Sequence, residues 1–144
     1  MPDWLLKPTE EVDVSRVVHF EIQADDVERA KTFYTAVFEW SFEDYSQFTG
    51  STYWGVVTGS DDQPGINGGL LQRPTPAPAM GQGANGFVCT MEVEDYDAME
   101  RRILDAGGQV ALPKSALPGV AWQGYYLDTE GNTFGIHQPD PEAA

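Results

Sequence analysis

The chain contains one order of predicted elements twice: a strand, a helix and then three strands. The first strand and helix fall within residues 17–40, and their counterparts fall within residues 87–108. Asp26 and Asp95 occupy matching places just before the two helices, and the matching last strands carry Gly69 and Gly135. Each unit has one helix that can cover one face of its own strands. The duplication predicts an α+β fold in which two βαβββ modules pair curved, mixed sheets into a cup.

The first strand has one apolar and one polar face, because its residue types alternate with a period of two. The alternating residues are Val18, Phe20 and Ile22 on the apolar face and His19, Glu21 and Gln23 on the polar face. Asp25 or Asp26 is the expected N-cap of the helix that follows, whose apolar residues recur three and four positions apart. We expect this helix to cover the apolar face, which leaves the polar face free to line a site.

We expect an N-terminal arm at residues 1–14, a first module at 15–72, a linker at 73–86, a second module at 87–139 and a tail at 140–144. The linker, RPTPAPAMGQGANG, is rich in Pro, Gly and Ala and has no apolar periodicity. The remaining strands are predicted at residues 41–47, 52–58, 66–72, 87–93, 109–111, 120–127 and 133–138. Asp95 is the expected N-cap of the second helix, and DTEGN at 128–132 is a predicted turn.

The chain is strongly acidic, with 23 Asp and Glu against 8 Lys and Arg among 144 residues and a formal charge of -15. This charge repels phosphate backbones and anionic lipids, so we expect no nucleic-acid or membrane partner. No apolar run is long enough to span a membrane, and the N-terminal sequence lacks the pattern of a signal peptide. The single cysteine, Cys89, is expected to be buried toward the second helix. These features predict a cytoplasmic protein.

The segment HFEIQADDVERAKTFYTAVFEW, together with VEDYDA, DAGG and the closing DTEGNTFGIHQ, resembles the vicinal oxygen chelate superfamily. That superfamily comprises glyoxalase I, fosfomycin-resistance proteins, extradiol dioxygenases and bleomycin-resistance proteins. The resemblance covers about residues 15–139 and is closest to glyoxalase-like bacterial proteins, which have a glycine where this chain has Glu39. It implies a cup that holds a divalent metal through ligands from the first and last strands of each module.

Only one of the four metal-ligand positions that the resemblance implies carries a suitable residue here. His19 matches the position in the first strand of the first module. Its counterpart in the second module is Val88, which cannot bind a metal. The last-strand positions are Gly69 and Gly135, and the family's enzymes carry a glutamate at the second of these. We therefore expect no cofactor, with a divalent metal as the alternative.

His19 and Glu21 share a strand face, and we predict that this pair acts as acid and base. An alternative is a displaced metal site with two histidines and one carboxylate, made by His19, Glu21 and His137. Glycine at two ligand positions leaves extra room in the cup, where aromatic side chains favour a flat or apolar ligand. The predicted ligand-binding residues are Gln23, Trp54, Gly69, Trp122, Tyr125, Gly135 and His137.

The expected function is that of a glyoxalase-like protein with a degenerate metal site, which sequesters or senses a small organic compound. Bleomycin-resistance members of the family also lack the metal set, so the resemblance supports this hypothesis. The alternative is a metal-dependent lyase, isomerase or dioxygenase, and the sequence does not decide whether the chain is an enzyme. A purely structural role is disfavoured by the retained polar strand face. Superfamily members form cups within one chain or between swapped chains, so a homodimer is one of two arrangements left open.

Overall fold

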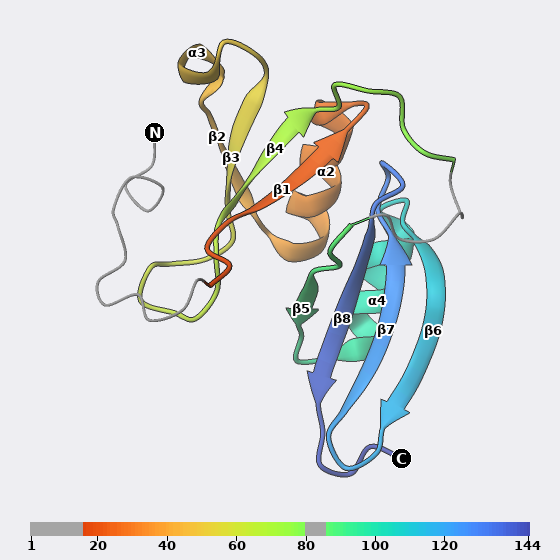
Figure 1. Cartoon of the computed structure of the whole chain (residues 1–144). Coiled ribbons are helices and arrows are strands. Elements are labelled where there is room, and N and C mark those ends of the chain that lie inside the picture. The colour runs from red at the N-terminus through yellow and green to blue at the C-terminus, as the bar shows by residue number, and fades with distance from the viewer. Residues whose placement is uncertain (1–15, 80–85) are drawn as a thin grey trace.

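The computed structural model describes residues 16–79 and 86–144, which form two four-stranded sheets, each with a long helix behind it in Figure 1. The elements of the first half are β1 Phe20–Ala24, α2 Val27–Phe38, β2 Ser41–Asp44, α3 Ser46–Thr49, β3 Tyr53–Val57 and β4 Gly68–Gln72. Those of the second half are β5 Thr90–Glu92, α4 Tyr96–Asp105, β6 Gln109–Leu117, β7 Ala121–Leu127 and β8 Thr133–Pro139. The predicted α+β class and the repeated βαβββ order are confirmed, with α3 as an addition.

The two sheets have the same topology. The strand order is β1-β4-β3-β2 in the first and β5-β8-β7-β6 in the second. In each sheet the first and last strands of the module pair in parallel, and the other pairs are antiparallel. The registers also correspond, because Glu21 pairs with Gly69 as Thr90 pairs with Gly135. The two sheets therefore present equivalent positions, although no ladder joins them within the described residues.

Both long helices begin at the predicted aspartates. The carboxylate of Asp26 accepts a hydrogen bond from the Arg29 amide at 3.0 Å, and that of Asp95 accepts one from the Ala98 amide at 3.1 Å. These bonds satisfy amides that a helix start leaves without an internal partner. The helix α2 ends at Glu39, whose φ of 62° lies in the left-handed region. None of the helices in the described ranges is long and apolar enough to cross a membrane.

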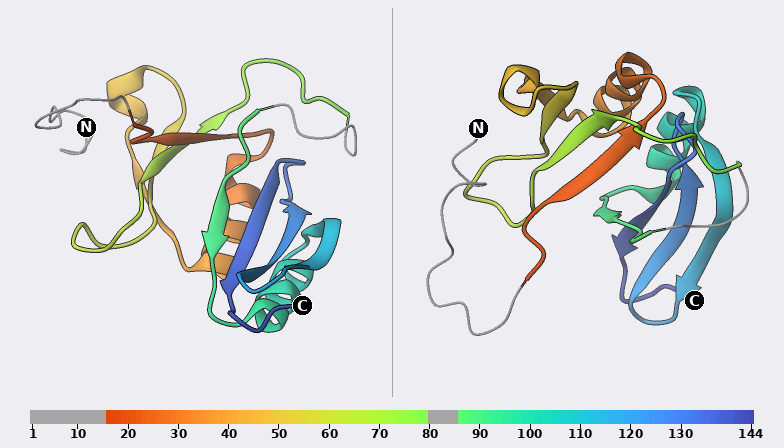
Figure 2. Two further views of the ribbon diagram at one scale, coloured as in Figure 1. Left: turned by 60° about the horizontal axis from the view of Figure 1, so that its bottom comes forward. Right: turned by 45° about the horizontal axis from the view of Figure 1, so that its top comes forward.

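A single apolar core joins the two modules, and α2 lies at its centre. In Figure 2, left, this helix (orange) lies between β1 and the strand β8 (blue). Its buried residues Phe33 and Tyr34 both contact the ring of Phe134 in β8, with ring centroids 6.0 and 6.4 Å apart. Trp40 is 8% exposed and stacks on Tyr34 at 5.1 Å. Because α2 packs against elements of both modules, neither sheet buries its apolar face without the other half of the chain.

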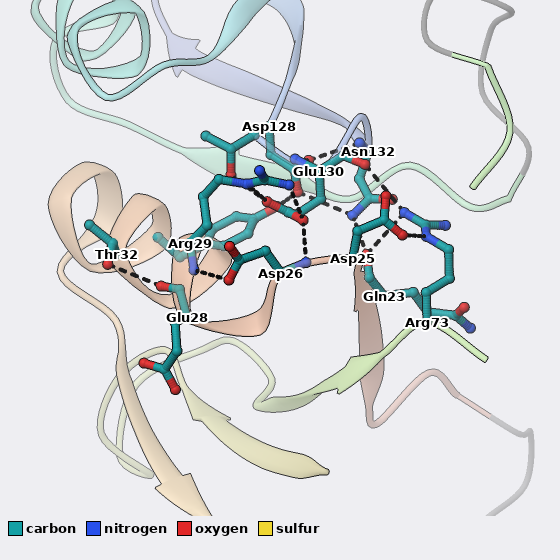
Figure 3. Close-up of polar contacts among 12 residues, drawn as sticks. Gln23, Asp25, Asp26, Glu28, Arg29, Thr32, Arg73, Asp128, Glu130 and Asn132 are labelled. Atoms are coloured by element: carbon teal, nitrogen blue, oxygen red, sulfur yellow. Dashed lines mark hydrogen bonds and ion pairs between the residues drawn. The ribbon is translucent and has the colours of Figure 1, made fainter. Parts of the chain in front are cut away.

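The turn at residues 128–132, predicted from DTEGN, docks on the start of α2 and forms the junction between the modules (Figure 3). Glu130, only 6% exposed, accepts hydrogen bonds from the Asp26 amide at 3.0 Å and from the Arg29 guanidinium at 2.6 and 3.0 Å. Arg73 donates to the Glu130 carbonyl at 3.2 Å and to the Asp25 carboxylate at 3.2 Å. Burial raises the pKa of Glu130, but the bonds from Arg29 and Asp26 outweigh it, so this pKa is lowered overall.

Asp128 is the second buried carboxylate of the junction, at 1% exposure. Its oxygens accept hydrogen bonds from the Tyr34 hydroxyl at 2.5 Å and from the amides of Glu130 and Asn132 at 2.8 Å each. Burial nevertheless raises the pKa of Asp128, and it raises the pKa of Tyr34 as well. The Asn132 side chain then donates to the Gln23 carbonyl at 2.8 Å, which ties the turn to the end of β1.

Strand ends in the first module differ from the prediction. The sequence predicts a strand over residues 41–47, but β2 ends at Asp44 and the chain turns into α3. The Asp44 carboxylate accepts a hydrogen bond from the Ser46 amide at 2.9 Å, which stabilises this turn. Val18 is 51% exposed rather than covered by α2, because β1 begins only at Phe20.

The second module also departs from the predicted boundaries. Its first strand covers only Thr90–Glu92, so Phe87 and Cys89 are exposed, and the prediction of a buried cysteine is wrong. By contrast, β6 continues to Leu117 because it pairs with β7 along a hairpin, with register shifts that accommodate Pro113. The predicted arm at residues 1–14 lies outside the described residues, as do residues 80–85 of the predicted linker.

Candidate functional site

The first sheet has a helix-covered face and an opposite face, which we call the first open face. Ala24 and Leu70 are fully buried on the helix side. The neighbouring positions Glu21, Gly69 and Tyr53 alternate with them and therefore lie on the first open face. The polar strand face predicted from the sequence is thus the face that α2 leaves uncovered.

Three side chains on this face form a hydrogen-bonded chain. The Nε2 atom of His19 lies 2.9 Å from the Tyr53 hydroxyl, and that hydroxyl donates to Glu21 Oε2 at 2.9 Å. The same Nε2 and Oε2 atoms are 3.7 Å apart, so the tyrosine bridges a histidine and a carboxylate that nearly touch. The side chains of His19 and Glu21 are 20% and 46% exposed, so a ligand can reach this group from solvent.

These bonds correspond to one arrangement of hydrogens on the three side chains. Tyrosine has one hydroxyl proton, which Tyr53 donates to Glu21. In this arrangement the hydroxyl accepts from His19, whose Nε2 then carries the hydrogen. Burial, followed by the hydrogen bond to Glu21 and its charge, raises the pKa of Tyr53, which keeps the phenol protonated at neutral pH. The two hydrogen bonds therefore point the same way: His19 donates to Tyr53, and Tyr53 donates to Glu21.

Glycines make room for the rings on this face. A Cβ atom at Gly69 would lie 2.1 Å from the Tyr53 hydroxyl oxygen, and one at Gly55 would lie 2.3 Å from the Tyr45 ring. The prediction that Gly69 leaves empty space is therefore wrong, because the Tyr53 side chain occupies that space. Tyr45 in turn donates a hydrogen bond to Glu43.

A shallow groove of about 410 Å³ continues along the same face. Its lining residues are Glu43, Tyr45, Gly55, Val56, Val57, Gly59, Ser60, Asp61 and Asn67. The register connects the groove to the histidine chain, because Glu21, Gly69, Gly55 and Glu43 form one row across the four strands. A second hollow of about 290 Å³ lies next to it, around Val18 and the loop at residues 58–67.

The second sheet has an equivalent open face, which we call the second open face. It carries Thr90, Gln123, Tyr125, Gly135 and His137, since these alternate with the buried Ile136 and Tyr126. The side-chain oxygen of Gln123, Oε1, lies 2.8 Å from His137 Nδ1 and accepts its hydrogen. A Cβ atom at position 135 would meet Thr90 Oγ1 at 2.8 Å and Gln123 Nε2 at 3.0 Å. Like Gly69, this glycine is covered by neighbouring side chains and does not enlarge the site.

Two predicted ligand-binding residues lie on the helix sides of the sheets. Trp54 pairs with the buried Leu70 and has Lys31 Nζ 3.3 Å from its ring centroid. Trp122 packs against the core, receives Lys114 Nζ at 4.6 Å and donates to Asp140 at 3.0 Å. The structure therefore separates both tryptophans from His19 and Glu21.

His137 does not join His19 and Glu21 within one chain. The two histidines belong to different sheets, and in residues 16–79 and 86–144 no three His, Cys, Asp or Glu side chains are grouped so that they could hold a metal ion. Gln23 follows Glu21 on the first open face by alternation, and its carbonyl accepts bonds from Asn132 and Arg73. Apart from the two tryptophans, the predicted residues thus divide into one group on each open face.

Tyr53, the central residue of the group on the first open face, is not among the site residues that the sequence predicts. The sequence predicts it only as part of a strand at residues 52–58. The sequence does contain glycines that could have indicated the position of this tyrosine. Tyr53 and Gly55 share a face, and the strand that pairs with them carries Gly69. Only the register shows that the tyrosine ring lies on that glycine.

Comparisons with known proteins agree with this architecture. The sequence model of the "Glyoxalase/Bleomycin resistance protein/Dioxygenase superfamily" matches residues 16–136. The "Putative glyoxylase CFP32" of Mycobacterium tuberculosis (strain CDC 1551 / Oshkosh) is 25% identical over 123 residues, which are 82% of this chain and 43% of that protein. This chain therefore spans less than half the length of that curated relative.

Solved structures show the same fold at low identity. A glyoxylase/bleomycin resistance protein/dioxygenase domain from Frankia sp. EAN1pec has a TM-score of 0.68 at 16% identity and covers 89% of this chain and 94% of its own. The fosfomycin resistance protein FosX from Listeria monocytogenes has a TM-score of 0.66 at 15% identity, with 88% and 95% covered. A mutant of that FosX was solved in complex with Mn(II) and 1S,2S-dihydroxypropylphosphonic acid. With its repeated βαβββ modules and a family match over most of its length, this chain belongs to the glyoxalase/bleomycin resistance protein/dioxygenase superfamily.

Proposed function

We propose that this protein binds a small organic compound on the first open face, around His19, Tyr53 and Glu21, without the metal set of the superfamily's enzymes. The observation that carries the proposal is the hydrogen-bonded chain from His19 through Tyr53 to Glu21, beside a groove of about 410 Å³. Polar groups at the edge of a groove fix the orientation of a ligand, while the tyrosine rings provide apolar contact. The carboxylates of Glu21, Glu43 and Asp61 favour a ligand with hydrogen-bond donors or positive charge.

A binding screen tests this proposal. Metabolites and antibiotics are screened by thermal shift on the wild-type protein, and calorimetry then gives the affinity of each hit for His19→Ala and Glu21→Gln. We expect each variant to bind about 1–3 kcal/mol more weakly, because His19→Ala removes a polar partner and Glu21→Gln replaces a charged hydrogen-bond acceptor by a neutral one. Glu94→Gln is the matched control, since Glu94 is an exposed carboxylate outside this face. Hits that bind all four proteins equally would place the site elsewhere.

A metal-dependent lyase, isomerase or dioxygenase is the second candidate. The Mn(II) complex of a FosX mutant, which shares this fold, favours it. In such an enzyme His19 would provide the ligand from the first strand, and His137 would have to come from another sheet. Metal analysis of the untagged protein separates the candidates, because this enzyme would retain about one divalent ion per site.

We also propose that the protein is a cytoplasmic homodimer. The outer strands β1 and β5 have free edges in the described chain, and the residues before them are apolar and exposed. Those residues are Val17, Val18, Phe87 and Val88. Exposed edges and apolar patches of this kind are usually covered by a partner. Light scattering after size exclusion tests the proposal, and a monomer at micromolar concentration would reject it.

A further inference from the structure

We infer that Tyr53 occupies the place where a side chain at position 69 would reach a metal, and that the Tyr53–Gly69 pair decides whether the first open face takes a metal or an organic ligand. The inference rests on the proposed function only for the location of the site. Tyr53 is then a specificity-determining residue that neither the family match nor any relative assigns.

The Tyr53 ring leaves no room for a side chain at position 69. A Cβ atom at Gly69 would be 2.1 Å from the Tyr53 hydroxyl oxygen and 2.4 Å from Cζ of its ring. Real Cβ atoms do not approach other atoms this closely, so a carboxylate side chain at position 69 and the present Tyr53 conformation exclude each other. Tyr53 is opposite Leu71 in the ladder, and its ring reaches diagonally over Gly69, where only a residue without a Cβ atom accommodates it.

Tyr53 engages two of the atoms on this face that could bind a metal, one from His19 and one from Glu21. A metal binds the nitrogen lone pair of a neutral imidazole, but Nε2 of His19 carries a hydrogen that points to Tyr53. The Glu21 oxygen nearest to His19 already accepts the Tyr53 hydroxyl hydrogen. A divalent metal would therefore have to replace the hydrogen bonds that Tyr53 makes with one ligand atom of each residue, Nε2 of His19 and Oε2 of Glu21.

The second open face of the same chain does not supply the metal ligands that the first open face lacks. Thr90 and Gln123 lie 2.8 and 3.0 Å from the place that a Cβ atom of Gly135 would take, and Val88 stands where the first module has His19. In each sheet a glycine is covered by a side chain from the antiparallel neighbour, Tyr53 in the first and Gln123 in the second. Neighbouring side chains thus occupy the Cβ space of both glycines, so neither sheet offers an open position for a carboxylate.

The test removes the tyrosine and restores a carboxylate. We compare Co(II) binding by calorimetry, and the Co(II)-induced change in melting temperature, for the wild type, Tyr53→Phe, Gly69→Glu, and Tyr53→Ala combined with Gly69→Glu. The combined variant should bind Co(II) more tightly than the wild type by at least the roughly tenfold that even an outer partner of a metal ligand contributes. Adding His19→Ala should abolish the gain. Gly69→Glu alone should melt at a lower temperature than the wild type and gain no Co(II) affinity.

Tyr53→Phe keeps the ring over Gly69, so it tests the role of the hydrogen bonds without a change in packing. It should bind Co(II) several-fold more tightly than the wild type, because His19 Nε2 and Glu21 are released. Wild-type affinity equal to that of Tyr53→Phe and of the folded combined variant would overturn the inference. A screen that finds no organic ligand would reject the proposed function but would leave these Co(II) results unchanged.

Discussion

Glu39 ends α2 in a left-handed conformation that side chains other than glycine rarely adopt. Its φ is 62°, and its amide donates to the Thr35 carbonyl at 3.0 Å. For a residue with a Cβ atom this conformation costs about 1–2 kcal/mol. Glu39 also places a negative charge at the carboxyl end of a helix, where the helix dipole disfavours it. One exposed residue thus combines two unfavourable contributions.

We expect Glu39→Gly to raise the free energy of unfolding by about 1 kcal/mol, because glycine removes the Cβ penalty at a helix end. Urea denaturation measures the change. Glu39→Ala is the control, since it removes the charge but keeps the left-handed Cβ. If the alanine variant gains as much as the glycine variant, the charge and not the backbone conformation is responsible.

Tyr34 is the residue that supports the buried carboxylate of Asp128. Removing the hydroxyl in Tyr34→Phe should lower the free energy of unfolding by about 1–3 kcal/mol at neutral pH, because a buried acceptor loses its donor. Tyr125→Phe is the matched control, since the Tyr125 side chain is half-buried and its hydroxyl makes no hydrogen bond to the described residues. Equal losses in the two variants would show that the Asp128 bond contributes nothing specific.

The pH dependence of the Tyr34→Phe effect follows from the Asp128 pKa. Burial raises this pKa above its ordinary value, so Asp128 favours folding when protonated and loses that contribution as pH rises through its folded pKa. Tyr34 stabilises the ionised form, so its deletion matters most at neutral pH. We therefore expect the difference between the wild type and the variant to shrink as pH falls through the carboxyl range. A difference that grows on acidification would contradict this assignment.

At the scale of elements, β4 is the strand on which the first module depends. It pairs with β1 on one side and β3 on the other, and its two glycines face opposite sides of the sheet. A Cβ atom at Gly68 would lie 2.6 Å from both the Phe20 ring and the Phe20 carbonyl oxygen. Because that oxygen belongs to the backbone, it cannot move without disturbing the β1–β4 pair.

We expect Gly68→Ala to cost about 1–3 kcal/mol, the usual range for forcing an extra carbon into a packed site. Chemical denaturation measures the loss. Gly59→Ala provides the control, because no heavy atom lies within 4 Å of its Cβ position and it should change stability by less than about 0.5 kcal/mol. If Gly68→Ala is as stable as the control, β1 and β4 have more freedom than their register implies.

The sequence predicts the elements well where a local rule determines them. Asp26 and Asp95 cap the helices as expected, and alternation correctly assigns Glu21 to the uncovered face. The sequence predicts extra room at Gly69, whereas the structure needs the glycines of β4 because side chains of neighbouring strands cover them. Such contacts join residues that are distant in the chain, so neither periodicity nor propensity contains them. The same holds for Trp54, whose face depends on register.

At the scale of the whole molecule, the shared core should make the two modules unfold together. Phe33 is 1% exposed and its ring contacts Phe134 of the other module. Phe33→Ala should cost about 3–5 kcal/mol, the range for deleting a buried aromatic side chain. Calorimetry should show one transition at a lower temperature, with near-ultraviolet and far-ultraviolet signals lost in step. Two separated transitions would show that the modules are independent.

The junction of Figure 3 also bears on the ancestry of the chain. A duplicated unit begins as two equal halves, and among the described residues only one of the two equivalent turns docks on its neighbour's helix. The second helix has Ala98 at the position that Arg29 takes in the first helix. The second helix therefore has no guanidinium at this position that could donate to a glutamate. The two halves therefore have different roles at the junction: the first provides the helix start, and the second provides the turn that binds to it. Neither could now be replaced by a copy of the other, and a chimera with a related protein would have to inherit Arg29 and Glu130 from the same parent.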